Sequence, residues 1–278
     1  MLHTAHADHP GAAAALVAGL AKRETPGFLI HTSGTGILGS GDFLRKTFGE
    51  VSQKLYDDFD NVKEIVEDFP DEAIHRNVDK IVLAAGTQHP GKVFTAIVAP
   101  PCINGPGRGP DNQKSIQIYW LAKAVLERKK GFQVGDGKNR WWDVHVQDLS
   151  NVFLRLVEEA IKGGGSATWG KEGYYFASNG EFYWGDIAKG VAKAAYDKKL
   201  IPTAEVDIVS AEEAESIRKY GSYMWGTNSR GKAIRARKLL GWEPKQKSVL
   251  EYLGDIVELE AKGLGIIPGH AAVAAGDA

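Results

Sequence analysis

Short apolar segments alternate with longer helical segments along most of the chain. Residues 27–32 and 93–99 are apolar runs bounded by glycine or proline, as buried strands are. Between them, residues 71–85 carry apolar side chains at helical spacing. Buried strands that alternate with amphipathic helices predict a parallel sheet covered by helices on both faces, so the expected fold class is α/β.

The same alternation continues toward the carboxyl end. Segments 33–41 and 102–110 are rich in glycine or proline and are expected to be loops at strand ends. The small-residue tail 269–278 is predicted to be disordered. Further helices are expected over residues 11–22, 113–129, 147–161, 183–197, 211–220, 229–240 and 248–263, and further strands over 132–134, 174–177 and 206–209.

The charge balance and the cysteine content restrict the function classes. The chain has 278 residues with 34 basic and 35 acidic side chains, so it lacks the basic field that nucleic acid or an anionic membrane would require. The single cysteine, Cys102, excludes an intrachain disulfide and a cysteine-based zinc site. With no long apolar run and no signal-peptide pattern, a cytoplasmic protein is expected.

Four segments together resemble the extended short-chain dehydrogenase/reductase family, which includes the NAD-dependent epimerases and dehydratases. They are F-L-I-H-T-S-G-T-G-I-L-G (residues 28–39), V-A-P-P-C-I-N-G-P-G (98–107), G-D-G-K-N-R-W-W-D-V-H-V-Q-D-L (135–149) and L-L-G-W-E-P (239–244). The resemblance implies a Rossmann-type parallel sheet with a smaller C-terminal substrate domain, and NAD or NADP as cofactor. It places residues 1–105 and 144–180 in the cofactor domain, and residues 106–143 and 181–278 in the substrate domain.

The resemblance also indicates what is missing. A dinucleotide-binding sheet opens with a strand, a glycine-rich turn and a helix, and no such turn precedes the first strand here. The glycine-rich segment 34–41 instead follows a strand in the slot of the family's catalytic Ser/Thr. Because residues 2–5 resemble the end of the family's fourth strand, the Rossmann sheet is expected to be N-terminally incomplete and to bind NAD or NADP poorly.

The family's catalytic Ser/Thr slot falls in the segment Thr32–Thr35. In a gap-free match the catalytic position is Gly34, so either Ser33 or Thr35 would orient the substrate oxygen. The alternative is that these residues only cap the end of a strand.

The slot of the family's Tyr-x-x-x-Lys pair falls on residues 75–80 and contains no tyrosine. If Lys80 is the lysine, Arg76 takes the tyrosine position, and a shift by one residue pairs His75 with Asp79. Arginine cannot release a proton near neutral pH. His75 is therefore the candidate proton donor, and Lys80 would hold the nicotinamide ribose.

Further residues follow from the same resemblance. The cofactor would contact Thr4, Ala5, Thr32, Ser33, Lys80, Pro101, Cys102 and Ile103, and the substrate would contact Asn104, Trp141 and Trp142. Paired tryptophans favour an apolar or aromatic substrate wall over a diphosphate clamp, so a sugar nucleotide is not expected. Cys102 is interpreted as a packed thiol, and no metal is expected at the histidines near the start of the chain.

The sequence therefore predicts an NAD(P)-dependent oxidoreductase or epimerase-like protein that acts on a small molecule. Two alternatives remain open, a non-catalytic dinucleotide-sensing or partner-binding protein and a truncated, inactive fragment. The substrate, the choice between NAD and NADP, and the oligomeric state are left open as well.

Overall fold

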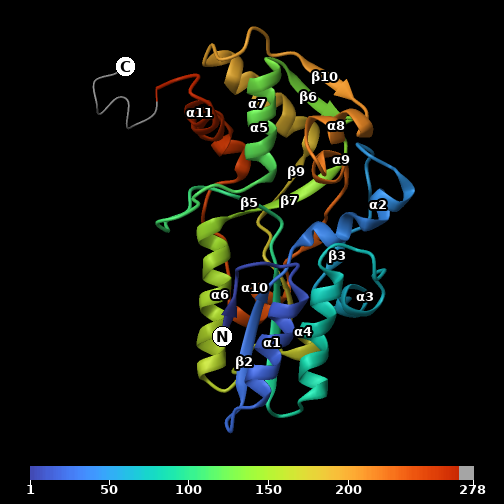
Figure 1. Ribbon diagram of the computed structural model, residues 1–278, viewed down its shortest axis with the longest axis vertical. Helices are drawn as coiled ribbons and strands as arrows, with labels where there is room; N and C mark the ends of the chain where they lie inside the picture. Colours follow the sequence, from blue (N-terminus) through green and yellow to red (C-terminus); the bar gives the residue numbers. More distant parts are fainter. Residues whose placement is uncertain (269–278) are drawn as a thin grey trace.

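Four parallel strands form the central sheet in the lower half of Figure 1. In spatial order they are β1 (Leu2–His3), β2 (Gly27–Thr32), β4 (Val93–Ala99) and β8 (Tyr174–Phe176). The computed structural model describes residues 1–268, so the tail 269–278 that was predicted to be disordered lies outside the described residues. The α/β class and the parallel, Rossmann-type sheet are confirmed.

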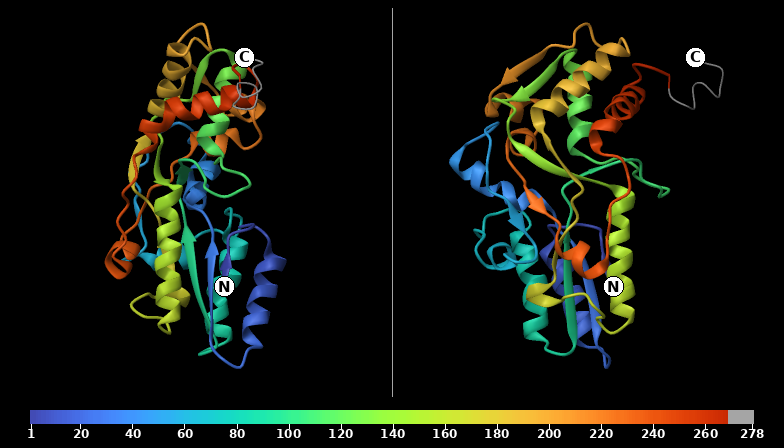
Figure 2. Two further views of the ribbon diagram at one scale, coloured as in Figure 1. Left: turned by 90° about the vertical axis from the view of Figure 1, so that its left-hand side faces the viewer. Right: turned by 180° about the vertical axis from the view of Figure 1, so that it is seen from behind.

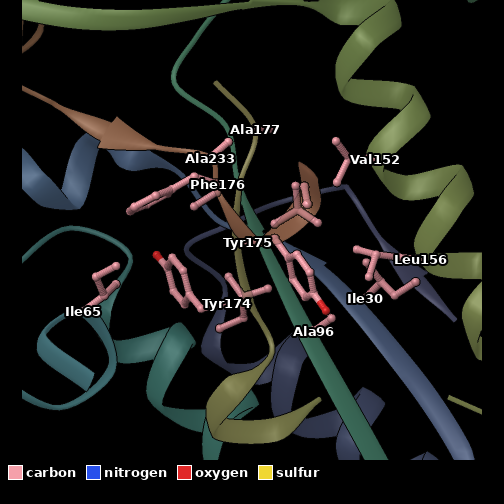
Figure 3. Packing of buried hydrophobic residues seen from close by; sticks show 14 of the residues in the cluster. Ile30, Ile65, Ala96, Val152, Leu156, Tyr174, Tyr175, Phe176, Ala177 and Ala233 are labelled. Carbon is pink, nitrogen blue, oxygen red and sulfur yellow. The ribbon is translucent and has the colours of Figure 1, made fainter. Parts of the chain in front are cut away.

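Helices cover both faces of this sheet, because its strands are apolar on both sides. One face carries α1 (Pro10–Ala21) and α4 (Arg76–Gln88), and the other carries α6 (Val146–Ile161) with the short α10 (Arg235–Leu240) (Figure 2, left). Successive side chains of β8 alternate between the two layers, and Figure 3 shows the rings of Tyr174 and Tyr175 on opposite sides of the strand.

A second apolar core fills the upper half of Figure 1. There β6 (Gly131–Val134) pairs in parallel with β10 (Val206–Val209). Three helices pack together beside them: α5 (Gln117–Arg128), α7 (Trp184–Asp197) and α11 (Leu253–Gly263). The largest fully buried side chains of this core are Trp225, Phe132 and Ile118.

A three-stranded sheet joins the two cores. It consists of β5 (Cys102–Asn104), β7 (Arg140–His145) and β9 (Gly180–Tyr183), with β7 in the middle. The remaining elements are η1 (Thr35–Gly39), α2 (Ser40–Arg45), β3 (Tyr56–Asp57), α3 (Val62–Glu67), η2 (Gly170–Glu172), α8 (Ala211–Ile217), α9 (Gly221–Gly226), β11 (Gly231–Lys232) and η3 (Val249–Tyr252).

Several expected elements have other bounds in the structure, and three of them differ most. The helix expected over 71–85 begins only at Arg76, because His75 has a left-handed backbone with φ of 66°. The expected helix 229–240 begins at Arg235, and the residues before it pair as β11 with β3. The expected loop 102–110 begins with β5, which pairs with β7. Within residues 1–268, no helix combines the length and apolar character needed to cross a membrane.

Candidate functional site

Ionisable side chains gather at the carboxyl ends of β1 and β2, beside the start of α4. Ligands of open parallel sheets bind at this edge, so it is the expected position of a functional site. His3 lies on β1, His31 lies near the end of β2, and Ser33 follows β2 directly. His75 precedes the first residue of α4 and lies against the loop that follows β2.

An aspartate orients the ring of His75. Nδ1 of His75 lies 2.6 Å from Oδ1 of Asp8, and this hydrogen bond lowers the pKa of Asp8. Because a carboxylate only accepts, Nδ1 carries the proton in this contact and Nε2 is the free nitrogen. Nε2 faces the loop after β2, since a Cβ atom built on Gly34 would lie 2.9 Å from it. The His75 side chain is 17% exposed.

A buried carboxylate holds the hydroxyl of Ser33. Ser33 Oγ donates to Oδ2 of Asp79 over 3.0 Å, and the Tyr174 hydroxyl donates to the same oxygen over 3.2 Å. Burial raises the pKa of Asp79 to about 6 and raises the pKa of Tyr174 well above its usual value. Tyr174 therefore stays protonated and does not replace the family's missing tyrosine. Oδ1 of Asp79 has no partner among the described residues.

Two stacked imidazoles lie under this edge. Nδ1 of His3 and Nδ1 of His31 are 2.8 Å apart, so one ring donates and the other accepts. Burial, together with the neighbouring His3 and His75, lowers the pKa of His31 to about 4. His31 is therefore neutral near pH 7. Within residues 1–268, no group of histidine, cysteine and acidic side chains has the arrangement of a metal site.

The structure brings His75 against the loop that carries Ser33, whereas the side chains of Thr35 and Lys80 have partners outside this site. Thr35 Oγ1 accepts from the Ser229 hydroxyl over 2.8 Å, inside the protein. Lys80 Nζ pairs with Asp71 over 2.9 Å at the surface, and its side chain is 51% exposed. Of the two registers considered for the Tyr-x-x-x-Lys slot, the one that pairs His75 with Asp79 is therefore the one whose side chains turn toward Ser33.

The residues expected at the cofactor lie near the same edge without forming one network. Thr4 and Ala5 are exposed after β1, and the half-buried Thr32 has a hydroxyl with no partner among the described residues. Pro101 and Cys102 are buried, and Ile103 is half-buried. Burial raises the pKa of the Cys102 thiol far above its usual value, which fits a packed thiol and not a nucleophile.

Two of the three residues expected at the substrate make structural contacts. Asn104 Nδ2 donates to Asp143 Oδ2 over 2.9 Å in the interior. Trp141 is 4% exposed, and its Nε1 donates to the Thr227 carbonyl over 2.8 Å. Trp142 is half-buried.

The turn after β2 has the spacing G-x-G-x-x-G (Gly34–Gly39), which is also the spacing of dinucleotide-binding turns. In such turns the glycines let a pyrophosphate approach the start of a long helix. Here side chains occupy that space, because Cβ atoms at Gly34 and Gly36 would meet His75 and Ile74 at 2.9 and 2.6 Å. Most of the turn is the 3-10 helix η1, which leads into the six-residue α2 and not into a long helix. This turn therefore does not form a pyrophosphate cradle.

Sequence reasoning missed the partners that orient the two central side chains. Asp8 lies 67 residues from His75 and Tyr174 lies 95 residues from Asp79, so no local pattern connects them. The spacing His75-x-x-x-Asp79 was the one feature of the sequence that could place these two side chains together, because residues four apart share one face of an expected helix.

Comparison with known proteins gives one relative and many similar folds. No family model matches the chain. The oxidase ucsJ of Acremonium sp. is 35% identical over 271 residues, which cover 94% of this chain and 78% of that protein.

Solved structures of low sequence identity share the fold. A dTDP-glucose 4,6-dehydratase from Streptomyces venezuelae with NAD bound has a TM-score of 0.58 at 16% identity, over 94% of this chain and 72% of that one. UDP-glucose 4-epimerase from Thermotoga maritima has a TM-score of 0.57 at 15% identity, over 91% and 69%. The predicted resemblance to the epimerase and dehydratase fold is thus confirmed.

The raised pKa of Asp79 predicts how its replacement changes the pH dependence of stability. Between about pH 4 and pH 6 the folded protein keeps the Asp79 proton that the unfolded chain releases, so Asp79 lowers stability as the pH rises through this window. Asp79→Asn removes this decrease in stability, because asparagine does not titrate. The free energy of unfolding of the variant relative to wild type should therefore rise by about 1–3 kcal/mol between pH 4 and pH 7.

Urea unfolding at several pH values measures this difference. Asp71→Asn is the matched control, because Asp71 is exposed and its pKa is lowered by Lys80. A pH-independent difference between wild type and Asp79→Asn would show that Asp79 titrates normally in the folded protein.

Proposed function

The chain belongs to the family of the oxidase ucsJ from Acremonium sp., and from this we propose that it is an oxidoreductase acting on a hydroxyl or carbonyl group of a small molecule. The observation that carries the proposal is the Asp8–His75 pair. It holds an imidazole at the carboxyl edge of a Rossmann-type sheet with Nε2 free beside the loop after β2.

In this proposal His75 is the group that exchanges the substrate proton. Oxidation of an alcohol requires a base for the hydroxyl proton, and reduction of a carbonyl requires an acid that returns it. Nε2 of His75 performs both roles by accepting and then returning one proton. Asp8 keeps the proton of Nδ1 in place and stabilises the imidazolium that forms.

Ser33 orients the reacting oxygen. Its hydroxyl donates to Asp79 in the structure, and in this role it turns to donate to the substrate oxygen, because the single proton of a substrate alcohol goes to Nε2 of His75. Asp79 occupies the position four residues after His75, where the resemblance implies a lysine. A lysine there lowers the pKa of a catalytic tyrosine, whereas a carboxylate would oppose tyrosine ionisation. This charge reversal agrees with histidine, and not tyrosine, as the acid and base.

The redox partner implied by the resemblance is NAD or NADP, which would supply or accept the hydride when bound. Similar folds such as the UDP-glucuronic acid 4-epimerase from Bacillus cereus were solved with NAD, at 15% identity and a TM-score of 0.55. Because side chains fill the glycine-rich turn after β2, the affinity of this chain for the dinucleotide is expected to be low.

The proposed substrate is a small molecule other than a sugar nucleotide. In the gap-free match, Trp141 takes the place of the arginine that clamps the diphosphate in sugar-nucleotide members. Its ring is buried against the second core and its Nε1 is used by Thr227, so this position offers no cation to a diphosphate.

We expect no measurable binding of NADH or NADPH in a fluorescence titration of the 278-residue chain up to ~1 mM nucleotide, because the glycine turn is filled by His75 and Ile74. A dissociation constant in the micromolar range would show that another segment holds the pyrophosphate.

Replacement of His75 should remove catalysis without unfolding the protein. A panel of small alcohols with a redox-dye acceptor, with and without NAD or NADP, identifies a substrate for the wild-type chain. His75→Gln should then lower the turnover number by roughly 10²–10⁴-fold. Asp8→Asn should lower it as well, because Nδ1 loses its carboxylate acceptor.

Lys80→Met is the matched control on the same helix, because Lys80 is paired at the surface. Its turnover number should equal that of wild type. Full activity in His75→Gln would contradict the assignment of His75. Loss of activity in Lys80→Met would show that Lys80 takes part in the reaction or in cofactor binding.

A further inference from the structure

A cavity of about 300 Å³ lies beside α2, and none of the residues assigned to proton transfer lines it. Its walls come from α2, from residues 52–56 and from residues 228–230, which are far apart in the sequence. We call it the α2 cavity. Figure 1 shows α2 and β3 along the same side of the molecule. The volume is at the lower end of the range for small-molecule sites.

The charged side chains that line the α2 cavity are mainly cationic. Arg45, Lys54 and Arg230 line it, and Asp42 is the one carboxylate among its lining residues. The charge of Asp42 is already matched. Its Oδ2 accepts from the backbone and side-chain nitrogens of Asn228 over 2.7 and 2.8 Å, and its Oδ1 accepts from Arg45 over 3.0 Å. Asp42 therefore holds Arg45 and Asn228 in the cavity wall, and its paired charge repels an anion less than an unpaired carboxylate would.

Arg230 is held rigidly at the back of the cavity. Its Nη1 donates to the Ser52 carbonyl over 3.2 Å, and its Nε and Nη2 pair with the two carboxylate oxygens of Glu181 over 2.5 and 3.4 Å. Arg140 shares both partners, since it donates to the Ser52 carbonyl over 2.7 Å and pairs with Glu181 over 3.3 Å. Two guanidinium groups thus share one carboxylate, which leaves a local excess of positive charge.

The neighbouring pairs do not cancel this excess. Lys54 pairs with Glu64 over 2.5 Å, and its Nζ also lies 4.9 Å from the centre of the Tyr56 ring. Around the cavity, four cations (Arg45, Lys54, Arg140 and Arg230) therefore face three carboxylates (Asp42, Glu64 and Glu181). The whole chain has the opposite balance, with 34 basic and 35 acidic side chains.

We propose that the α2 cavity binds a small organic anion through its carboxylate or phosphate group, with Arg45 as the recognising side chain and Arg230 as a fixed positive charge at the back. A guanidinium has five donors and suits the planar or tetrahedral oxygens of such groups. Arg45 uses one nitrogen for Asp42, so its remaining donors are available. Leu38 and the Tyr56 ring provide the apolar wall for the body of the anion.

This site goes beyond the proposed redox chemistry and does not require it. The loop that carries Ser33 continues through η1 and α2 into the wall of the cavity. An anion bound there would be adjacent to one end of this loop, and binding can be measured without any catalytic turnover.

Thermal unfolding of the full chain with added anions tests the proposal. Inorganic phosphate and malonate are the probes, and sodium chloride at equal ionic strength corrects for general screening. A saturating probe should raise the melting temperature by about 5 °C or more, because a ligand that binds only the folded state stabilises it. Arg45→Met and Arg230→Met should each weaken binding at least tenfold.

Arg128→Met is the matched control for Arg45→Met, because Arg128 is also an exposed, ion-paired arginine, whose partner is Asp207. It should bind both probes as wild type does. Stabilisation by phosphate alone identifies a phosphate-bearing ligand, stabilisation by malonate alone identifies a carboxylate, and stabilisation by both identifies any oxyanion of this size.

No stabilisation beyond sodium chloride would overturn the proposal, as would equal losses in Arg45→Met and Arg128→Met. If Arg230→Met does not fold, Arg45→Met carries the test, since the Arg45 side chain is 64% exposed.

Discussion

Buried aspartates hold together segments that are distant in the sequence. Asp143 on β7 accepts hydrogen bonds from Asn104, Gly180 and Val249, and Asp58 accepts from the backbone of Phe176, Ile234 and Arg235. A buried carboxylate that loses its donors destabilises the folded state by several kcal/mol. Because these donors come from both cores and from the sheet between them, the two halves of the chain cannot separate without leaving such charges unpaired.

Carboxylates that accept hydrogen bonds from distant segments also orient the side chains of the candidate site. Asp79 accepts hydrogen bonds from the hydroxyl groups of Ser33 and Tyr174, and Asp8 accepts a hydrogen bond from Nδ1 of His75. Each carboxylate orients the side chain that it contacts, and Nε2 of His75 remains as a nitrogen that can accept a proton. The proposed chemistry depends on Ser33, which lies on the loop after β2, and on His75, which precedes α4 and lies against that loop.

The fold could be predicted from the sequence more completely than the site. The parallel sheet could be predicted because the apolar pattern of strands and helices is visible in short segments of the sequence. Ser33 and His75 could be proposed because each lies in a short segment that resembles a motif of the family. Asp79 and Lys80 show where local reasoning fails. A helix turns by about 100° per residue, so adjacent residues point in different directions, and only packing shows that Asp79 turns inward while Lys80 reaches Asp71 at the surface. The Asp8–His75 contact spans 67 residues and has no sequence signature.

The tautomer of His75 tests the central claim most directly. Nitrogen-15 NMR of the full chain distinguishes a protonated ring nitrogen from an unprotonated one while the imidazole is neutral. The account predicts a proton on Nδ1 and none on Nε2, and it predicts that Asp8→Asn removes this preference, because Asp8 is the acceptor that holds the proton. A neutral ring with its proton on Nε2 would contradict the account, since the nitrogen at the loop could then not accept a substrate proton.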